Sequence, residues 1–406
     1  MSILLQIGVE VNSGSTGRIA EQLGEVAMSH GWESYITYAR AYQPSKSNVI
    51  KIGNNFSVYY HVLQTRLFDN HGFASTRATK KLIKQIKKIN PDVIQLHQLH
   101  GYYLNLQLLF EYFASIDTPV VWSLHDCWAM TGHCAHFVLC GCERWRTQCF
   151  KCPQKNKYPK SLVFDRSRNN FIQKKKLFTS VKNLTIVPTS LWIEGLAKES
   201  FLFKHAMIVI TNGIDTNTFS PQSNTLEVKT KYNIQGDFMI LGVGTEWNAN
   251  KGLYDYYELR EKLSDNYMIV LVGLQKKQIE ELPKGIIGIP RTESINELVQ
   301  LYSAADVVTS LSYLETFGLT PVEGFACGTP AIVYNCTATP ELVTPEVGFV
   351  VEPGNIEGIA DVIIQIRTKG KMYYSRNCRV RAEKFYKKED KFGEYIKLYE
   401  ELIQSK

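Results

Sequence analysis

Two carboxylates in the second half of the chain are the first candidates for chemistry. Glu315 and Glu323 lie within the segment ETFGLTPVEGFACGTP, separated by seven residues. Pro321 favours a first helical turn and Gly328 a helix end, so the residues from Gly318 onward would present free backbone N–H groups. Such a helix N-terminus binds phosphate, and each carboxylate can accept hydrogen bonds from two hydroxyl groups. The segment indicates a diphosphate site between two hydroxyl-binding carboxylates, although Glu323 alone is explained more simply as a first-turn acid that favours the helix dipole.

A second segment joins an apolar run to a helical pattern. It is GVGTEWNANKGL, residues 242–253, and its basic residue is Lys251. Arg291 follows in a later loop.

The first half has its own glycine loop, SGSTGRI, which follows the first apolar run. Gly14 and Gly17 would let the backbone approach a phosphate or a sugar, and the N-terminus of the following helix would point there. Arg18 could pair with a phosphate, but an exposed helical arginine is an equally good interpretation.

Histidines end two further apolar runs of the first half. His125 is followed by Asp126, and the segment LHQLHGYYLN contains His97 and His100 and ends at Asn105. Open α/β sheets bind ligands beyond the carboxyl ends of their strands, so these positions suit a site. Ordinary packing is the alternative interpretation for each of them.

Six of the nine cysteines lie in a short segment, residues 127–153, which is expected to form an insert. Cys149 and Cys152 have the C-x2-C spacing of a structural zinc site, and further cysteines lie nearby. His133 and His136 are alternative ligands. Free thiols and disulfides are the competing interpretations, and a reducing cytosol disfavours disulfides.

The elements that must position these residues alternate between short apolar runs and longer helical patterns. Apolar runs without strict alternation indicate parallel strands covered on both faces. Two such series indicate two doubly wound α/β domains. The expected strands are Ile3–Val9, Tyr35–Ala39, Asp92–His97, Val120–His125, Leu184–Ser190, Met207–Gly213, Met239–Gly244, Tyr267–Gly273, Gly285–Ile289, Ala305–Ser312, Pro330–Asn335 and Gly348–Glu352.

The expected domains are residues 1–213 and 214–386. Asn212–Asp215 and the polar stretch Ser220–Gly236 are interpreted as the linker between them. Residues 387–406 have apolar side chains at helical spacing, which predicts a terminal helix that packs back on the first domain.

Composition and charge narrow the class of protein. With 406 residues and 44% hydrophobic side chains, the chain can bury large cores. The N-terminus lacks the basic region of a signal peptide and no run is long enough to span a bilayer, which predicts a cytoplasmic protein. The net charge of +7 is concentrated in the first half, where basic residues recur at helical spacing from Arg77 to Lys88. They favour an anionic membrane, a phosphorylated acceptor or nucleic acid, and a solvated outer helix is the alternative.

The segment from Glu315 to Pro330 resembles the signature of the retaining family-4 glycosyltransferases of the GT-B fold. Val333–Glu341 fits the same pattern, and so does Asn212–Asp215 with the Phe219 and Pro221 that follow. The resemblance covers nearly the whole chain, with its specific motifs in residues 125–153 and 212–341. It implies an α/β protein with two doubly wound Rossmann-like domains facing a central cleft, which transfers a sugar from a UDP or GDP sugar.

The resemblance also implies roles for particular residues. Glu315 would bind the hydroxyls of the donor sugar, Glu323 the nucleotide ribose, and Lys251 the diphosphate. The family's clamp arginine is missing, and Thr245 and Glu246 stand near its expected place. His125 would contact the transferred sugar near the reacting carbon. The implied donor site further includes Gly17, Gly244, Phe317, Gly318 and Leu319, and the acceptor side includes Gly14, Arg18, His100 and Asp126.

The chemistry implied is a front-face displacement through an oxocarbenium-like state, in which the leaving diphosphate accepts the acceptor's proton. Lys251 and helix N–H groups would stabilise the leaving group, so no cofactor is expected for catalysis. A subgroup of bacterial family-4 enzymes has a similar cysteine stretch, which implies a structural zinc ion held by Cys134, Cys142, Cys149 and Cys152.

The resemblance to enzymes of surface-polysaccharide assembly implies a glycan or lipid-linked saccharide acceptor, met at the inner face of the membrane. Two other hypotheses stay open. An inactive GT-B subunit that binds a partner would explain the missing arginine. A nucleic-acid-binding protein would explain the basic half, but the sequence contains no recognised binding module, so no nucleic acid is expected as a partner.

Overall fold

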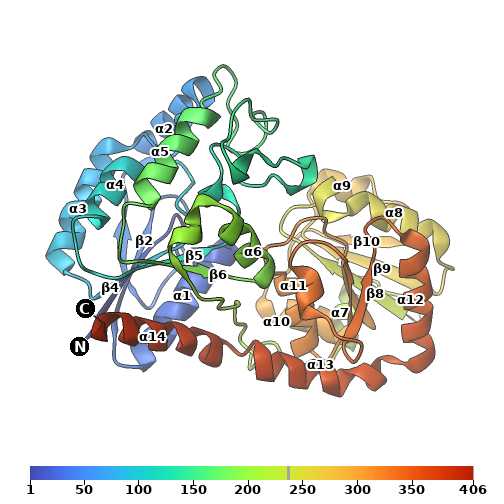
Figure 1. Cartoon of the computed structure of the whole chain (residues 1–406). Coiled ribbons are helices and arrows are strands. Elements are labelled where there is room, and N and C mark those ends of the chain that lie inside the picture. Colours follow the sequence, from blue (N-terminus) through green and yellow to red (C-terminus); the bar gives the residue numbers. More distant parts are fainter. Residues whose placement is uncertain (236–237, 406) are drawn as a thin grey trace. The chain divides into compact units, whose positions relative to one another are not determined.

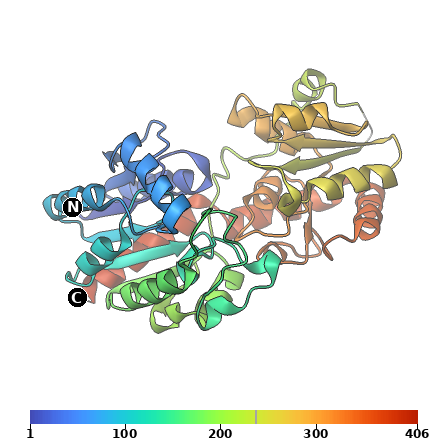
Figure 2. The same ribbon diagram turned by 90° about the horizontal axis from the view of Figure 1, so that it is seen from above.

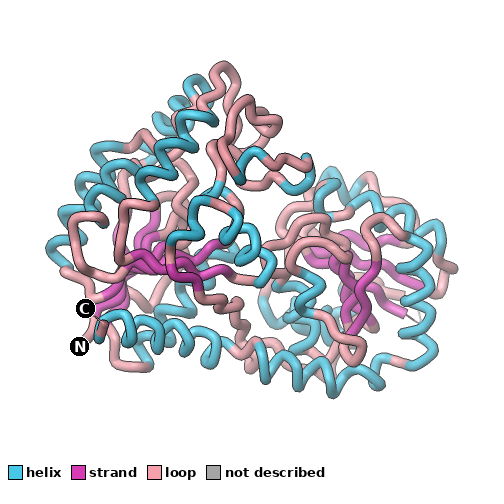
Figure 3. Tube along the Cα trace, viewed as in Figure 1, coloured by secondary structure: helices cyan, strands magenta, loops and turns pink. Residues whose placement is uncertain are grey.

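The computed structural model describes residues 1–235 and 238–405, which form two compact units. The first unit contains Met1–Thr211 and Glu389–Lys406, and the second contains Asn212–Lys388 (Figure 1). Each unit is a parallel sheet with helices packed around it (Figure 3). Gly236 and Lys406, the last residues of the expected linker and terminal helix, lie outside the described residues. Among those that are described, no helix is long and apolar enough to cross a membrane.

The first unit contains a seven-stranded sheet in the order β3-β2-β1-β4-β5-β6-β7. Its strands are β1 (Ile3–Ile7), β2 (Glu33–Tyr38), β3 (Asn48–Lys51), β4 (Val93–Leu96), β5 (Val120–Leu124), β6 (Leu184–Pro188) and β7 (Ala206–Met207). Its helices are α1 (Gly14–Ser29), α2 (Asn55–Phe68), α3 (Thr76–Ile89), α4 (Leu106–Phe113), α5 (Ser167–Phe178), α6 (Leu191–Glu199) and α14 (Lys388–Gln404), which Figure 2 shows from above. The chain order reverses between β1 and β4, so the topological switch point lies there.

Neighbouring residues of the central strands enter different cores because side chains alternate across a strand. Leu4 packs with α1 and α14 on one face of the sheet, whereas Leu5 belongs to the core under α3, α4 and α5. Helix α14 is fixed to the first sheet by polar contacts as well. The Tyr395 hydroxyl lies 2.8 Å from the Ser123 hydroxyl, and the Tyr399 hydroxyl donates to Gln95 Oε1 over 2.8 Å.

The second unit contains a six-stranded sheet in the order β10-β9-β8-β11-β12-β13. Its strands are β8 (Phe238–Val243), β9 (Tyr267–Val272), β10 (Ile286–Ile289), β11 (Val307–Ser310), β12 (Ala331–Tyr334) and β13 (Gly348–Val351). Its helices are α7 (Leu226–Lys231), α8 (Leu253–Lys262), α9 (Lys276–Glu280), α10 (Ile295–Ala304), α11 (Leu319–Ala326), α12 (Ile356–Lys369) and α13 (Lys371–Phe385). The switch point of this sheet lies between β8 and β11. The predicted class, two doubly wound α/β units, is confirmed.

Some details of the sequence prediction are wrong. Strand β3 was missed because it is a short, largely exposed edge strand without an apolar run. The run Met207–Gly213 contributes only its first residue to a strand. The described part of Ser220–Gly236 is no linker: it lies in the second unit and contains α7, whose Val228 is buried there.

The chain passes between the units twice, and the two passages pair with each other. Ile214 N–H donates to Tyr386 O over 2.7 Å, and Lys388 N–H donates to Ile214 O over 2.9 Å. The Lys388 ammonium also pairs with Asp215 at 2.6 Å. These contacts give Asp215, from the motif Asn212–Asp215, a structural role at the passage.

Candidate functional site

The loops after β8 and β11 follow the two strands at the switch point of the second sheet, and they pack directly on each other. Gly252 has a φ of +69°, and a Cβ added to it would lie 2.1 Å from Leu311 O. Only glycine allows this approach. The contact brings the Lys251 ammonium into an ion pair with the Glu315 carboxylate, so the two predicted charged residues lie together.

Glu315 is also fixed through its backbone. Its N–H donates to the Thr337 hydroxyl over 3.0 Å, and its carbonyl accepts from Ala338 N–H over 3.2 Å. Both contacts come from the segment after β12. The side chains of Lys251 and Glu315 remain 33% and 21% exposed, so a ligand can reach the pair.

Helix α11 begins directly after this loop. Gly318, with a φ of +101°, precedes it, and the first N–H groups of the helix have no partner within it. Free N–H groups at such a helix start can bind a phosphate. Gly318 is buried, and Leu319 is partly exposed at the helix start.

The structure contradicts the simpler interpretation of Glu323 as a first-turn acid. It is the fifth residue of α11, and the first turn contains no acidic residue, so it is not a first-turn acid. Its carboxylate accepts a hydrogen bond of 2.7 Å from the hydroxyl of Tyr302, which is fully buried. Tyr302 therefore holds the carboxylate in place.

Two other residues of the predicted donor site, Phe317 and Gly244, lie in different surroundings. Phe317 is 3% exposed and packs in the core, with its ring 5.9 Å from that of Tyr386, so only its backbone could meet a ligand. Gly244 directly follows β8, and a Cβ added there would lie 3.2 Å from the ring of Trp247. Trp247 was not singled out in the sequence. Its indole donates to Val272 O over 2.8 Å, which fixes the loop.

No basic residue replaces the missing arginine within the loop after β8, where Thr245 and Glu246 are exposed. Arg291 is exposed after β10, the edge strand two places from β8. Lys251 and the start of α11 are therefore the candidate phosphate-binding groups in the described part of this loop region.

In the first unit, the loops after β4 and β5 enclose a small pocket. Its polar lining includes His97, His100, His125 and Asp126. His97 Nε2 lies 2.9 Å from Gln6 Oε1, and its ring stacks on that of His125 at 5.6 Å. Burial lowers the pKa of His125 to about 4, although the Asp126 carboxylate acts in the opposite direction. His125 is thus neutral at physiological pH.

His100 and Asp126 form a closed pair in this pocket. Asp126 Oδ2 lies 2.5 Å from His100 Nε2, and the Tyr158 hydroxyl lies 2.8 Å from His100 Nδ1. Burial alone would raise the pKa of Asp126, but His100 and the Trp128 N–H, which donates to Oδ1, hold that pKa well below its usual range. The carboxylate therefore stays charged.

The predicted glycine loop after β1 is largely the first turn of α1, which begins at Gly14 and includes Gly17 and Arg18. A Cβ on Gly17 would lie 3.3 Å from the carbonyl of Glu10, which explains the small residue. Gly14 is exposed, and Arg18 is exposed and donates through Nε to Gly14 O over 3.0 Å. Asn105 has a structural role, because it caps α4 by accepting from Leu108 N–H over 3.1 Å.

Glu10 and Arg40 were missed by the sequence reasoning. Burial raises the pKa of Glu10 while the Arg40 guanidinium lowers it. Both charges also affect the pKa of Tyr158, beside His100, which Glu10 raises and Arg40 lowers. Arg40 comes two residues after β2, which pairs with β1. The strand-end rule could have identified it.

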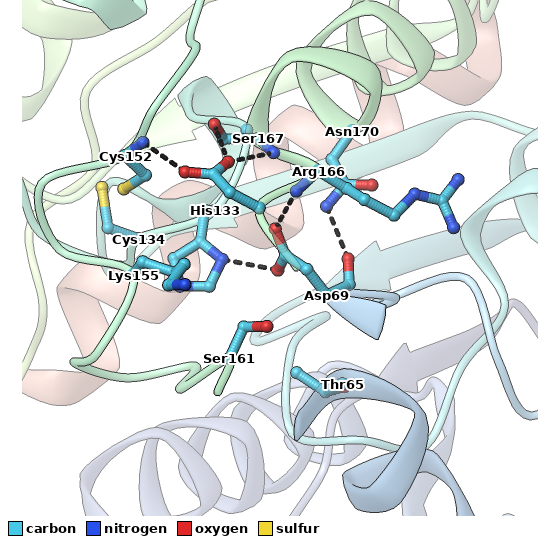
Figure 4. A network of polar contacts seen from close by, with 12 residues as sticks. Thr65, Asp69, His133, Cys134, Cys152, Lys155, Ser161, Arg166, Ser167 and Asn170 are labelled. Carbon is cyan, nitrogen blue, oxygen red and sulfur yellow. Dashed lines mark hydrogen bonds and ion pairs between the residues drawn. The ribbon is translucent and has the colours of Figure 1, made fainter. Parts of the chain in front are cut away.

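The cysteines gather in the insert. Cys134, Cys142, Cys149 and Cys152 line one pocket with His133, whereas Cys127 is fully buried elsewhere in the core and Cys140 is exposed. Figure 4 shows Cys134 beside Cys152. The hydrogen bond from the Cys134 thiol lowers the pKa of Cys152 to about 7. As the described side chains stand, no three histidine, cysteine, aspartate or glutamate residues are close enough together to hold a metal ion.

Comparison with known proteins identifies the fold. Residues 228–385, within the second unit, match the family model of the glycosyl transferases group 1. Sucrose-phosphate synthase from Thermosynechococcus elongatus aligns with a TM-score of 0.73 and 16% identity over 100% of both chains. Anabaena HepE, solved in complex with UDP, aligns with a TM-score of 0.67 and 15% identity over 99% of this chain and 100% of that one. The chain has the GT-B fold, with two Rossmann-like domains.

The curated relatives that match parts of the chain are named as glycosyltransferases. The colanic acid biosynthesis glycosyl transferase WcaC of Escherichia coli K12 is 30% identical over 187 residues, 43% of this chain and 45% of that one. A GDP-mannose-dependent phosphatidylinositol dimannoside mannosyltransferase of Mycobacterium tuberculosis is 25% identical over 217 residues, 51% and 56% of the two chains. The chain spans about half the length of these curated relatives.

Proposed function

We propose that this protein is a retaining glycosyltransferase that transfers a sugar from a nucleoside diphosphate sugar to a glycan or a lipid-linked saccharide in the assembly of a surface polysaccharide. One observation carries the proposal. The Lys251–Glu315 pair lies beside the start of α11, at the switch point of a sheet that matches a glycosyl transferase model.

The donor would be held by complementary groups. Lys251 and the first N–H groups of α11 bind the diphosphate, Glu323 binds the ribose, and Glu315 binds the sugar hydroxyls. As the bond from the anomeric carbon to the diphosphate oxygen breaks, the growing negative charge is stabilised by the ammonium and the helix start. The acceptor hydroxyl attacks the same face and gives its proton to the leaving diphosphate, which balances the step without a protein base or a cofactor.

The first unit would supply the other substrate contacts. His125 is the residue proposed to approach the transferred sugar, and the charged Asp126 with His100 would bind acceptor hydroxyls. The basic first unit favours an anionic acceptor at the inner face of the membrane. An unchanged anomeric configuration in the product, measured by NMR, would establish the retaining course, and inversion would rule it out.

Replacing Glu323 with alanine is expected to weaken nucleoside diphosphate binding at least ~10-fold, because the ribose hydroxyls lose a charged acceptor. The measurement is calorimetry with UDP, GDP, ADP and CMP, which also identifies the base. Tyr302→Phe keeps the carboxylate but removes the hydroxyl that holds it, so its effect should be smaller. Glu261→Ala, an exposed residue near the end of α8, is the matched control.

Either of two results would contradict the donor site. One is binding of none of the four nucleotides by the unaltered protein, which would favour the inactive-subunit hypothesis. The other is equal affinity in Glu323→Ala and Glu261→Ala.

We also propose that the cysteine pocket binds a structural zinc ion. The four thiols already line one pocket, and coordination would require them to turn toward a common centre. Zinc measured by elemental analysis is expected in the purified protein, and a chelator should lower its melting temperature by several degrees. Cys149→Ser should lose the metal, whereas Cys140→Ser, at an exposed thiol, should keep it. Metal-free protein whose melting temperature a chelator leaves unchanged would reject the site.

A further inference from the structure

Helix α2 exposes its aromatic side chains and Leu63, and the residues it buries are polar. Its two buried residues are His61 and Thr65. His61 is satisfied internally, with Nδ1 2.8 Å from the Ser75 hydroxyl and Nε2 accepting from Gly72 N–H over 3.1 Å. A surface helix of a globular protein normally shows the opposite arrangement, so the outer face of α2 needs an explanation.

The outward residues of α2 belong to one apolar patch with the segment before α5. Phe56 and Tyr59 are 78% and 72% exposed. Leu162 N–H donates to Arg66 O over 2.7 Å, so the segment runs along the end of α2. The Phe68 and Phe164 rings stack at 5.9 Å. We define the apolar patch by its exposed members, which are Phe56, Tyr59, Tyr60, Leu63, Phe68, Leu162, Val163 and Phe164.

The sequence around α2 is strongly basic. Between residues 49 and 90 the only acidic residue is Asp69, and its side chain is fully buried. Helix α3, which begins at Thr76 next to the His61 partner Ser75, exposes six basic side chains and buries Leu82 and Ile86. Its exposed basic residues are Arg77, Lys80, Lys81, Lys84, Lys87 and Lys88.

Aromatic and aliphatic side chains beside a dense positive charge match the chemistry of an anionic bilayer. Tyrosine and phenylalanine enter the interfacial region, and each nearby basic residue adds attraction to acidic headgroups. A second copy of this chain would bring like charges together, which disfavours self-association through this face. An exposed patch of this kind marks an interaction site.

We propose that the apolar patch and α3 together form a surface that docks on an anionic membrane. Docking would present the first unit to a lipid-linked acceptor, and that functional part rests on the proposed function. Membrane binding itself does not depend on transfer, so the two can fail separately.

The experiment is cosedimentation of the full chain with vesicles of phosphatidylcholine alone or mixed with phosphatidylglycerol. The protein should bind the mixed vesicles and leave them at high salt. The variant Phe56→Ser/Tyr59→Ser/Leu63→Ser should bind at least ~10-fold more weakly, and Lys80→Glu/Lys84→Glu/Lys87→Glu should do the same.

Matched controls come from the second unit. Leu226→Ser/Met372→Ser removes two apolar residues that are 73% and 82% exposed, and Lys276→Glu/Lys277→Glu reverses two exposed charges. Both controls should bind vesicles normally, and every variant should keep its affinity for nucleotide.

Three results would overturn the proposal. They are no binding of the unaltered protein to phosphatidylglycerol vesicles, equal binding by the apolar-patch variant, and self-association in solution that the apolar-patch variant abolishes. The last would assign the surface to a second copy of the chain. If the unaltered protein binds no nucleotide, the result contradicts the proposed function. The vesicle result then still decides the membrane proposal by itself.

Discussion

Sugar transfer is expected to fall at least ~100-fold when either Lys251 or Glu315 is replaced with alanine, the loss that follows removal of one charge-stabilising group from an active site. The two side chains form an ion pair where the loops after β8 and β11 meet. Because both remain partly exposed, the pair contributes little to folding. The variants should therefore fold normally and lose activity, which separates a functional role from a structural one.

Nucleotide binding should distinguish the two residues. Lys251→Ala removes the ammonium that would neutralise the diphosphate, so UDP or GDP should bind more weakly. Glu315→Ala removes the carboxylate that now occupies that ammonium, so nucleotide affinity should be kept or increased while transfer is lost. Calorimetry together with a steady-state transfer assay would measure both effects.

A second lysine–glutamate pair of the same unit provides the control. Lys262 and Glu357 lie 2.8 Å apart on the surface, and their side chains are 50% and 69% exposed. Lys262→Ala and Glu357→Ala make the same charge changes away from the site and should leave transfer unaltered. If Lys251→Ala or Glu315→Ala behaves like these controls, that residue does not belong to the active site.

The pairing of Lys251 with Glu315 shows what the sequence could and could not predict. Each residue was identified because it follows an apolar run and precedes a helical pattern, which marks the carboxyl end of a strand. Their contact depends on Gly252, whose conformation lets the two loops touch. A backbone approach between Gly252 and Leu311, 59 residues apart, leaves no periodic signal in the sequence, so the pair itself could not be derived.

In the first unit, too, the sequence could predict some features and not others. Buried strands such as β5 are recognisable because all of their residues are apolar or small and covered, whereas the exposed strand β3 is not. His100 and Asp126 were both candidates, but their link to Tyr158 runs through a segment with no regular structure. Arg40 and Glu10 escaped notice because single charged residues carry no motif. Which of these side chains lie together depends on tertiary contacts between loops.

Asp69→Asn is expected to destabilise the first unit by about 3 kcal/mol, the cost of removing one partner from a buried ion pair. Asp69 Oδ1 lies 2.6 Å from His133 Nδ1, and both side chains are fully buried. Oδ2 accepts from Arg166 N–H over 2.7 Å, and the Asp69 carbonyl accepts from the Asn170 amide over 2.8 Å (Figure 4). One residue thus joins the end of α2, the cysteine-containing insert and the start of α5.

The choice of asparagine isolates the charge. Asp69 has a φ of +51°, a left-handed conformation that asparagine tolerates and alanine does not. The pKa of His133 shows what the charge does: burial lowers it, but the Asp69 carboxylate outweighs burial and the pKa is raised. In Asp69→Asn burial becomes the dominant effect, so the pKa of His133 falls and the ion pair is lost.

Urea unfolding followed by tryptophan fluorescence would measure the loss, because every tryptophan except Trp247 lies in the first unit. Asp117→Asn, at an exposed residue between α4 and β5, is the control for a lost carboxylate. His133→Gln should destabilise as well, and the double variant should cost less than the sum of the two, since both remove the same pair. Strict additivity, or an Asp69→Asn protein as stable as Asp117→Asn, would show that the three segments are held together by their apolar packing rather than by this carboxylate.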